Sequence, residues 1–493
     1  MPHSPTPQAP AGSTLADATL ADLPSSIAVP TYDRSALTPS VVHLGVGGFH
    51  RAHQAVYLDD LAEQGISTDW GITGVSLRRP AMRDALVPQD GLYTVVERDE
   101  RFDRPRVIGA LQRCLFAGED AEEVMAALTD RRTRLVTLTL TGGAYDAGED
   151  DEDLDRPGTA FGWIAAALRR RRADGTPPFV VLSCDNVPEN GAAARRATLE
   201  VARRHDADLA GWIAEAVRFP SSVVDRITPE TTDDLRALLA ERHGVVDQWP
   251  VATEPFRQWI VEDALGVDGP PLDQVGVQLV ADVAPYERMK KRLLNGGHSA
   301  LGYVGYLLGH RDTSGAMADP LVHDFLDRLM ADEVAPLLPE VPGIDLDEYR
   351  RSLLRRFANP AVGDQLARLC GRGSTKVPSY LLPSIEEARE RGRPHELLTL
   401  AVAAWVRYLR GTDLEGREIA IRDARLDELQ PLAQEGGDDP APLFERTDDV
   451  FGWLADDPML VRSVERALRA LERDGLRCTV EAYVRAEAGR VAA

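Results

Sequence analysis

Short, nearly continuous apolar runs alternate with segments whose apolar residues recur every three or four positions in the first half of the chain. Such runs are typical of strands buried on both faces of a parallel sheet, and the longer spacing is typical of helices that cover it. The alternation predicts a doubly wound α/β domain. The predicted strands are 41–44, 71–77, 134–140 and 179–183, and the predicted helices are 51–64, 161–171 and 192–204.

From about Tyr286 the pattern changes to long helical periods with few strand-like runs. Because 493 residues are too many for one ordinary core, we expect two domains that divide at this change. A Rossmann-type, dinucleotide-binding domain would occupy 1–284, with a loose arm rich in Pro, Ser and Ala at about 1–27. A mainly helical substrate and catalytic domain would occupy 285–493, with helices at 287–309, 320–335, 384–410 and 457–474.

The charge balance narrows the range of partners. The net charge is −23, whereas nucleic acids and anionic membranes require a basic face, so neither is an expected partner. The N-terminus lacks the pattern of a signal peptide, and no apolar run is long enough to cross a bilayer. Four cysteines without CxxC spacing are typical of buried thiols in a reducing compartment. These features predict a cytoplasmic protein.

A glycine turn follows the first predicted strand. Gly45 and Gly47 fit the first two glycines of GxGxxG, in which backbone N–H groups and a helix N-terminus hold the pyrophosphate of a dinucleotide. His50 stands where the third glycine is expected, and a purely structural strand–helix turn is the alternative. For a cofactor site, the expected contacts are Gly45, Val46, Gly47, Gly48, Phe49 and Arg78.

The residues after the second predicted strand bear on the choice of dinucleotide. NAD sites commonly place an Asp or Glu there for the adenosine ribose, but this chain has Arg78 and Arg79. Arginines at this place favour the 2′-phosphate of NADP, unless they are plain surface charges. Nearby, His50 and His53 have the spacing of metal ligands, yet no third ligand accompanies them, so we predict no metal site.

Polar residues end two apolar runs later in the first domain. Asn186 follows the strand predicted at 179–183, and Asp225 follows a shorter run. Because ligands of open α/β sheets bind beyond the carboxyl ends of the strands, Asn186 is placed to offer its amide to a substrate. The alternative is a strand-ending turn, in which Asn is common. Asp225 is the weaker of the two signals.

The segment that opens the second domain combines several reactive side chains. Only three of the 56 basic residues are lysines, namely Lys290, Lys291 and Lys376. Lysine can lose its proton in a protein and arginine cannot, so lysines kept in an arginine-rich chain suggest chemistry. On a continuous α-helix, Glu287, Asn295 and His298 lie within about 140° of Lys290. The alternative is a charged helix with a core histidine.

Several segments together resemble the mannitol dehydrogenase family of long-chain, polyol-specific dehydrogenases. They are GVGGFHRAHQ, SCDNVPENG, VVDRITP, EPFRQW and YERMKKRLLNGGHSALGYVGYL, and the resemblance runs from about residue 28 almost to the C-terminus. It implies a Rossmann-type domain followed by a mainly helical one, no catalytic metal and, in many members, a monomer. The implied reaction is hydride transfer between a polyol and a nicotinamide cofactor, such as D-mannitol to D-fructose.

The resemblance also implies a role for each matching residue near the carbinol. Lys290 would be the general base that removes the hydroxyl proton. Asn186 and Asn295 would form the oxyanion site for the carbinol oxygen. His298 would bind a neighbouring substrate hydroxyl.

Further residues would hold the polyol or move its proton. Arg368 and Lys376, in RLCGRGSTK, resemble the polyol-binding pair of the family, and Asp225 would be another substrate contact. Relatives tend to have a glutamate near Gly142 that helps to move protons. Because this chain lacks it, the proton path would rely more on Glu287.

Several interpretations stay open on the sequence alone. Family members usually carry an acidic residue after the second strand, so NAD is the expected cofactor and NADP the alternative. A fructuronate reductase-like sugar-acid oxidoreductase would need a cation for the carboxylate, while D-arabinitol or sorbitol would differ from D-mannitol by one hydroxyl contact. Outside these, a non-catalytic dinucleotide-binding module and a zinc-dependent dehydrogenase are the remaining candidates.

Overall fold

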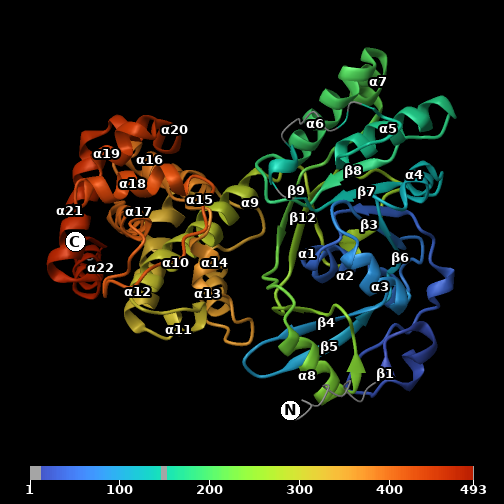
Figure 1. The fold of residues 1–493 in the computed structure, drawn as a ribbon, viewed down its shortest axis with the longest axis horizontal. Helices are drawn as coiled ribbons and strands as arrows, with labels where there is room; N and C mark the ends of the chain where they lie inside the picture. Colours follow the sequence, from blue (N-terminus) through green and yellow to red (C-terminus); the bar gives the residue numbers. More distant parts are fainter. Residues whose placement is uncertain (1–12, 141, 146–150, 152, 492–493) are drawn as a thin grey trace, which may run out of the picture. The chain divides into compact units, whose positions relative to one another are not determined.

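Two units make up the chain, Met1–Ala284 and Pro285–Ala493 (Figure 1). The computed structural model describes residues 13–140, 142–145, 151 and 153–491. The first unit contains parallel strands covered by helices, and the described part of the second unit contains helices and no named strand. This arrangement confirms the predicted fold class, a Rossmann-type doubly wound domain followed by a mainly α-helical one.

A five-stranded parallel sheet forms the centre of the first unit, with the order β6-β3-β2-β7-β8. The chain runs outward from β2 to one side and then returns to add β7 and β8 on the other. The carboxyl ends of β2 and β7 therefore flank the point where the strand order reverses, which is where open α/β sheets bind ligands. The strands are β2 (Val41–Leu44), β3 (Ile72–Ser76), β6 (Leu111–Phe116), β7 (Leu135–Leu138) and β8 (Val180–Ser183).

Helices cover both faces of this sheet, so alternate side chains of each strand enter different cores. Val42 and Leu44 of β2 belong to one core, while Val41 belongs to the other. Burial on both faces explains why the strands read as continuous apolar runs. Helices α4 (Ala121–Thr129), α5 (Ala160–Ala173), α6 (Asn190–His205) and α7 (Ala207–Ala216) contribute to the first core, and α2 (Gln54–Glu63) contributes to the second.

Two three-stranded sheets and a short strand pair complete the first unit. One has the order β11-β4-β5, built from Val251–Thr253, Tyr93–Arg98 and Asp103–Ile108. The other has the order β13-β12-β9, built from Gln278–Val280, Gln258–Glu262 and Ser222–Asp225. The remaining helices are α1 (Gly48–Ala52), α3 (Ala81–Leu86) and α8 (Asp233–His243).

The N-terminal segment corrects the prediction of a loose arm at about 1–27. Ser13–Thr14 forms β1, which pairs in parallel with β10 (Val245–Val246). Leu15 is completely buried in a small core that includes Leu92 and Val107. A few well-placed apolar side chains thus outweigh the Pro-, Ser- and Ala-rich composition on which the prediction rested. Residues 1–12 lie outside the described residues.

The second unit is organised around a helix that is buried on all sides. Every residue of α17 from Leu397 to Leu409 is buried, as expected for a helix that is apolar around its whole circumference. It packs against α10 and α21. The α-helices described in this unit are α9 (Ala284–Met289), α10 (Gly296–Leu307), α11 (Thr313–Met317), α12 (Pro320–Arg328), α13 (Leu346–Phe357), α14 (Leu366–Cys370), α15 (Gly373–Tyr380), α16 (Leu382–Glu390), α17 (Glu396–Leu409), α18 (Leu426–Gly436), α19 (Ala441–Arg446), α20 (Asp448–Phe451), α21 (Pro458–Asp474) and α22 (Leu476–Val491).

Two predicted helices are interrupted in the structure. The helix predicted at 384–410 is two helices, α16 and α17, because Gly392 has a φ of 62° and Pro394 follows it. The helix predicted at 51–64 begins earlier, at Gly48, and breaks at His53 between α1 and α2. Three of the four cysteines are buried as predicted, whereas Cys478 is exposed.

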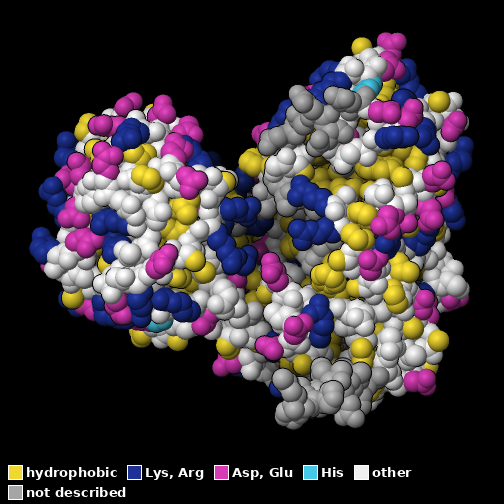
Figure 2. Space-filling model, in the orientation of Figure 1, with side chains coloured by type: hydrophobic (Ala, Val, Ile, Leu, Met, Phe, Trp, Pro, Cys, Tyr) yellow, Lys and Arg dark blue, Asp and Glu magenta, His cyan; other side chains and the backbone are white. Residues whose placement is uncertain are grey.

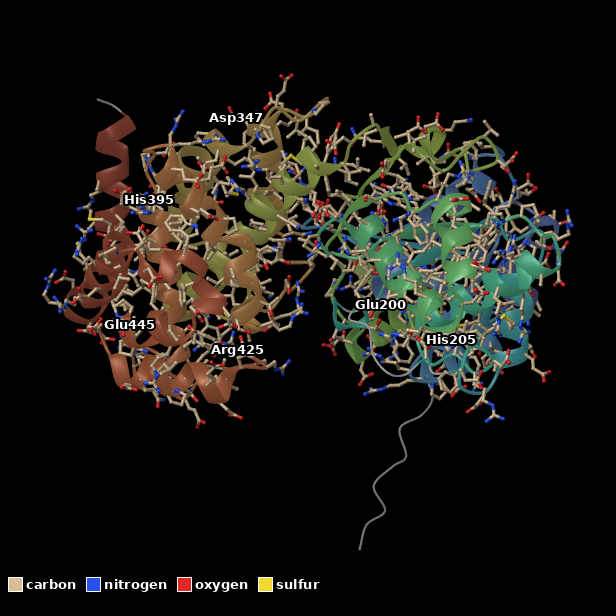
Figure 3. The ribbon with its side chains drawn as sticks, turned by 90° about the horizontal axis from the view of Figure 1, so that it is seen from above. Glu200, His205, Asp347, His395, Arg425 and Glu445 are labelled. Carbon is tan, nitrogen blue, oxygen red and sulfur yellow. The ribbon has the colours of Figure 1, made fainter. Side chains whose placement is uncertain are left out.

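Most charged side chains lie on the outside of the two units. Glu200, Asp347 and Glu445 are exposed on their helices and are labelled in Figure 3. On the face drawn in Figure 2, acidic and basic side chains are interspersed. Every helix among the described residues is too short or too polar to cross a membrane.

The buried position of Leu15 leads to a stability prediction. Leu15→Ala removes a completely buried side chain, so we expect the free energy of unfolding to fall by about 2–5 kcal/mol. Urea denaturation followed by tryptophan fluorescence measures this loss. The control is Val267→Ala in the same unit, because Val267 is fully exposed. A loss at Leu15 no larger than that of the control would mean that residues 13–27 do not stabilise the unit.

Candidate functional site

The glycine turn after β2 is held closely against the end of β7. Gly45 has a φ of 101°, and a Cβ at this position would clash with the carbonyl oxygen of Thr139. The Thr139 hydroxyl also donates a hydrogen bond to the carbonyl oxygen of Gly45 over 2.8 Å. Only glycine satisfies both the left-handed conformation and the close approach. The turn therefore lies at the reversal of strand order, where the sequence predicted a dinucleotide.

A cavity of about 830 Å³ adjoins this turn at the carboxyl ends of β2, β3 and β7. Its size is in the range of small-molecule and cofactor sites. Of the predicted cofactor contacts, Gly45, Val46 and Arg78 line it, whereas Gly47, Gly48 and Phe49 are at the start of α1 outside its lining. The described lining residues include no Asp or Glu; they are Gly45, Val46, Ser76, Leu77, Arg78, Arg79, Ala81, Met82, Thr139, Leu140, Gly143, Ala144, Gly158, Thr159, Ala160 and Trp249.

The two histidines with metal-ligand spacing serve different parts of the core. His53 uses both ring nitrogens, one with the Gln54 amide and one with the carbonyl oxygen of Gln258. The His50 ring stacks on His43 with 3.4 Å between ring centroids. Burial keeps His50 neutral, because it holds the pKa of that ring well below its usual value. Within the described residues, no group of three metal-ligating side chains occurs.

The end of β8 carries a buried carboxylate directly before the predicted substrate amide. The Asp185 carboxylate accepts hydrogen bonds from the Tyr145 hydroxyl over 2.5 Å and from the backbone N–H of Leu140. Burial raises the pKa of Asp185 to about 6, and the hydrogen bonds from Tyr145 and Leu140 oppose that rise. Asn186 follows on the exposed side of the turn. Asp185 thus ties the segments that follow β7 and β8 together at the ligand-binding edge of the sheet.

The second polar strand end, Asp225, is the last residue of β9. It pairs with Gln258 of the antiparallel neighbour β12 and is almost completely buried. Asn186 and Asp225 therefore both lie at the carboxyl ends of strands of the first unit, as the sequence predicted.

In the second unit, the lysine-rich segment is π-helical. α9 continues through a π-helical stretch at Lys290–Asn295 into α10, and the N–H of Gly296 bonds to the carbonyl oxygen of Lys291, five residues earlier. The sequence-based helical wheel assumed a regular α-helix and is wrong here. Residues five apart lie above one another in a π-turn, so Lys290 and Asn295 share one face more closely than the α-helical spacing predicts.

Among the buried polar atoms from Lys290 to the end of α10, two belong to predicted site residues and have no hydrogen-bond partner in the second unit. They are Nδ2 of Asn295 and Nε2 of His298. A buried polar atom without a partner costs about 1–3 kcal/mol, and such atoms commonly mark a place where a ligand or water binds. Burial lowers the pKa of His298 to about 3, so its imidazole is neutral at physiological pH. Both groups are therefore uncharged hydrogen-bonding groups.

Arg368 and Lys376 lie close enough to His298 to act on its charge. Both cations lower the pKa of His298, while Asp364 raises it. Arg368 forms a two-pronged ion pair with Asp364, with 2.6 Å between Nε and Oδ1. Lys376 donates from Nζ to the carbonyl oxygen of Leu369 over 2.8 Å. Three predicted substrate residues of the second unit, His298, Arg368 and Lys376, therefore lie close together near α10.

Glycines on α10 allow the helix that carries Arg368 to pack closely against α10. Cβ atoms at Gly302 and Gly305 would press against Leu369 and Leu366 of α14. Their absence lets α14, which carries Arg368, pack directly on α10. Burial lowers the pKa of Lys376, on the following helix α15, to about 8, and the neighbouring Arg372 and Arg368 add to this effect.

The predicted proton-path residue has a partner on its own helix. Glu287 forms an ion pair with Lys291 one turn away. Of the two neighbouring lysines, Lys291 is therefore engaged with a carboxylate, while Lys290 lies on the face that it shares with Asn295.

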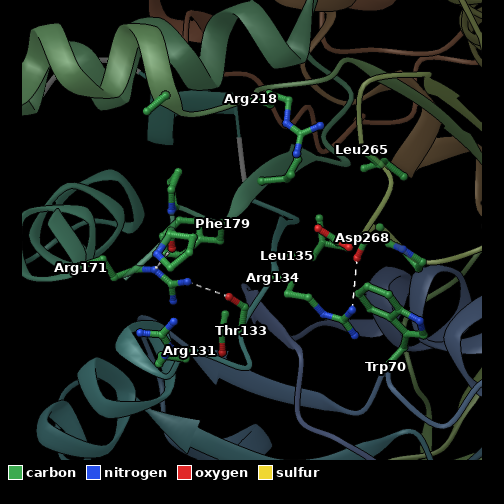
Figure 4. A pocket seen from close by; sticks show the side chains of 16 residues that line it. Trp70, Arg131, Thr133, Arg134, Leu135, Arg171, Phe179, Arg218, Leu265 and Asp268 are labelled. Carbon is green, nitrogen blue, oxygen red and sulfur yellow. Dashed lines mark hydrogen bonds between the residues drawn. The ribbon is translucent and has the colours of Figure 1, made fainter. Parts of the chain in front are cut away.

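A second cavity, of about 470 Å³, lies at the amino ends of β7 and β8 (Figure 4). Four arginines line it, but the buried guanidinium groups are engaged in contacts within the protein. The guanidinium of Arg171 donates to the carbonyl oxygens of Pro177, Leu128, Asp130 and Thr133. Arg134 lies 4.0 Å from the ring centroid of Trp70 and donates to the carbonyl oxygen of Asp268. This cavity is at the opposite end of the sheet from the glycine turn.

Fold and glycine turn define a Rossmann-type domain followed by a helical second domain. Residues 39–273 match the Mannitol dehydrogenase Rossmann domain, and residues 282–472 match the Mannitol dehydrogenase C-terminal domain. The chain belongs to the mannitol dehydrogenase family, which confirms the resemblance seen in the sequence.

Named relatives and solved structures agree with this assignment. A mannitol 2-dehydrogenase of Phaeosphaeria nodorum is 43% identical over 93% of this chain and 84% of that protein, and one of Aspergillus fumigatus is 42% identical over 93% and 96%. The Pseudomonas fluorescens mannitol 2-dehydrogenase, solved with NAD and D-mannitol, has a TM-score of 0.87 and 39% identity, covering 96% of this chain and 100% of that chain. A substrate-free D-sorbitol dehydrogenase has a TM-score of 0.85 and 32% identity, covering 95% and 100%.

The raised pKa of Asp185 generates a prediction about pH dependence. Because an aspartate carboxyl has an ordinary pKa of 3.8 and the pKa of Asp185 in the fold is about 6, the folded chain binds more protons than the unfolded chain between about pH 4 and 6. Stability contributed by this group is therefore present at low pH and is lost as the pH rises through that window. The loss amounts to about 3 kcal/mol at about 1.4 kcal/mol per pKa unit.

Asp185→Asn is expected to remove this loss, since a neutral amide replaces the carboxylate. Urea denaturation at pH 4, 5, 6 and 7 should show the variant gaining stability relative to the wild type as the pH rises. Asp174→Asn, at an exposed position of the same unit, is the control. A constant difference between the Asp185 variant and the wild type across this range would refute the assignment.

Proposed function

We propose that this chain is a metal-independent polyol dehydrogenase that oxidises C2 of D-mannitol to give D-fructose. Membership of the mannitol dehydrogenase family and the named relatives support the reaction. The observation that carries it to this chain is the pair of unpartnered, uncharged buried atoms, Asn295 Nδ2 and His298 Nε2. Hydroxyl groups of a polyol are suited to satisfy both.

In this proposal Lys290 is the general base. Its neutral amine accepts the proton of the C2 hydroxyl, while the amides of Asn295 and Asn186 donate hydrogen bonds to the oxygen as negative charge develops on it. The π-turn supports this assignment, because it places Lys290 and Asn295 on one face. Glu287 is assigned to the path that carries the proton onward. When bound, a nicotinamide supplies the hydride acceptor at C4.

The residues assigned to the rest of the substrate favour a neutral molecule. A sugar acid would need an uncommitted cation for its carboxylate. The Arg368 guanidinium is already paired with Asp364, which leaves Lys376, whose pKa burial lowers to about 8, as the weaker cation of this group. Hydroxyl groups can still accept hydrogen bonds from Lys376 and donate them to Asp225 or to neutral His298. We therefore propose an uncharged polyol as the substrate in preference to a fructuronate-type sugar acid. D-sorbitol is the second candidate, which the likeness to a D-sorbitol dehydrogenase favours.

NAD is the proposed cofactor, with NADP accepted as well. The glycine turn supports a dinucleotide site, because Gly45 and Val46 line a cavity at the reversal of strand order. The relative from Pseudomonas fluorescens was solved with NAD, which supports NAD. Arg78 and Arg79 line the adjoining cavity, and the described lining includes no carboxylate. Guanidinium groups there would favour the 2′-phosphate that distinguishes NADP.

The function is tested with a panel of D-mannitol, D-sorbitol, D-arabinitol and D-fructuronate, each with NAD(H) and NADP(H). We expect the highest kcat/KM with D-mannitol, measured from nicotinamide absorbance, and turnover with both cofactors. The variants Arg79→Ala and Arg78→Ala, made separately, should each raise KM for NADP by about 10- to 100-fold, as the loss of charged hydrogen bonds implies. Both should leave KM for NAD near the wild-type value. Turnover of D-fructuronate alone would overturn the polyol assignment.

The base is tested with Lys290→Met. Loss of a general base lowers kcat by about 10²- to 10⁴-fold, and the rise of kcat/KM with pH in the oxidation direction should disappear. Lys291→Arg is the matched control, because arginine keeps the ion pair with Glu287, and it should keep most of its turnover. Wild-type assays in excess chelator should retain full activity. Unchanged turnover of Lys290→Met at neutral pH would exclude Lys290 as the base.

A further inference from the structure

Strands β8 and β9 carry the two polar strand ends of the first unit but belong to different sheets. β8 is the edge strand of the five-stranded sheet, and β9 is the edge strand of the β13-β12-β9 sheet. No strand ladder joins them. The positions of Asn186, after β8, and Asp225, at the end of β9, therefore depend on other contacts between these two edges.

Asn190, the first residue of α6, makes such contacts with its side-chain amide. Its Oδ1 accepts a hydrogen bond from the N–H of Ser222 over 2.9 Å, and its Nδ2 donates to the carbonyl oxygen of Ser222 over 2.8 Å. The side chain thus pairs with the first residue of β9 as a neighbouring peptide group would in a sheet. The same Nδ2 donates to the carbonyl oxygen of Asp185 over 2.9 Å.

This third bond acts on the peptide group that precedes the proposed oxyanion residue. The carbonyl of Asp185 and the N–H of Asn186 belong to one planar unit, so a bond that fixes this carbonyl also fixes the start of Asn186. Asn190 is 3% exposed, and the three bonds use both donors and the acceptor of its amide. Aspartate, with the same shape, lacks the donors that the two carbonyl oxygens require.

Neighbouring contacts hold Asn190 in place. The Ser222 hydroxyl donates to the carbonyl oxygen of Ser183, at the end of β8, over 2.6 Å. A Cβ at Gly191 would clash with the backbone at Phe219–Ser221, so glycine lets the start of α6 lie directly against the segment that enters β9. The turn before it contains Glu189 in the left-handed conformation, with a φ of 47°.

We propose that Asn190 is a positioning residue for catalysis, which sets the orientation of Asn186 by joining the end of β8 to the start of β9. The inference rests on the proposed function, because it assumes that Asn186 stabilises the charge on the carbinol oxygen. Asn190 itself is buried behind the turn and acts through the peptide before Asn186.

A double-mutant cycle tests this role. Asn190→Ala should lower kcat for polyol oxidation by about 10- to 100-fold, the size expected when a catalytic group is misplaced by about 1 Å, while the cofactor Kd from fluorescence titration stays near the wild-type value. When Asn186→Ala is already present, Asn190→Ala should lower kcat little further, because the group that it positions is gone. A merely structural role would lower kcat equally in both backgrounds, and that result would overturn the proposal.

Two further variants keep the test decisive. Asn190→Asp preserves the shape and the bond from the Ser222 N–H, and it replaces Asn190→Ala in the cycle if the alanine variant does not fold. Thr198→Val removes another buried hydrogen bond of α6, from the Thr198 hydroxyl to the Ala194 carbonyl, and should leave kcat unchanged. If Asn186→Ala alone kept wild-type turnover, the oxyanion role of Asn186 in the proposed function would be wrong. Equal losses of kcat in both backgrounds would instead contradict only the positioning role of Asn190.

Discussion

Burial of the central sheet on both faces is the constraint on which the first unit depends. Helices cover both sides of β2, β3 and β7, so a polar side chain on a strand face needs a partner within the core, as His43 and Thr137 find in each other, and polar groups that can meet a ligand lie at the strand ends. The carboxyl ends accordingly collect the glycine turn, Thr139, the Asp185 carboxylate and Asn186. The reversal of strand order opens a place beside Gly45 that a ligand can enter. The same arrangement that stabilises the sheet therefore locates its chemistry.

In the second unit, several candidate site residues lie on one face of a single helix. A regular α-helix would spread Lys290 and Asn295 over a wide angle, and the π-turn aligns them instead. The glycines of α10 then allow α14 to approach closely enough for Arg368 to influence His298. Backbone geometry and residue size, rather than charge, bring this constellation together.

Sequence patterns predicted the regular parts of the fold and supplied the candidate site residues. Strand β2 occupies the predicted residues because continuous apolar runs are specific for buried strands. The packing of residues 13–27 was missed, since a few apolar side chains in a Pro- and Ala-rich segment give no period. Apolar spacing likewise cannot distinguish a π-turn from an α-turn, so the alignment of Lys290 with Asn295 required the structure.

Contacts between distant segments of the chain could not be predicted either, because no local sequence pattern indicates them. The pairing of Arg368 with Asp364 and the three hydrogen bonds of Asn190 depend on how loops and helix starts meet. Their effect on the site is nevertheless large. An arginine whose charge is compensated no longer favours an anionic substrate, and burial keeps the His298 ring neutral. The electrostatic character of the second unit's candidate site is thus set less by which residues occur in the motif than by the partners that folding gives them, and that character suits a substrate recognised through hydroxyl groups.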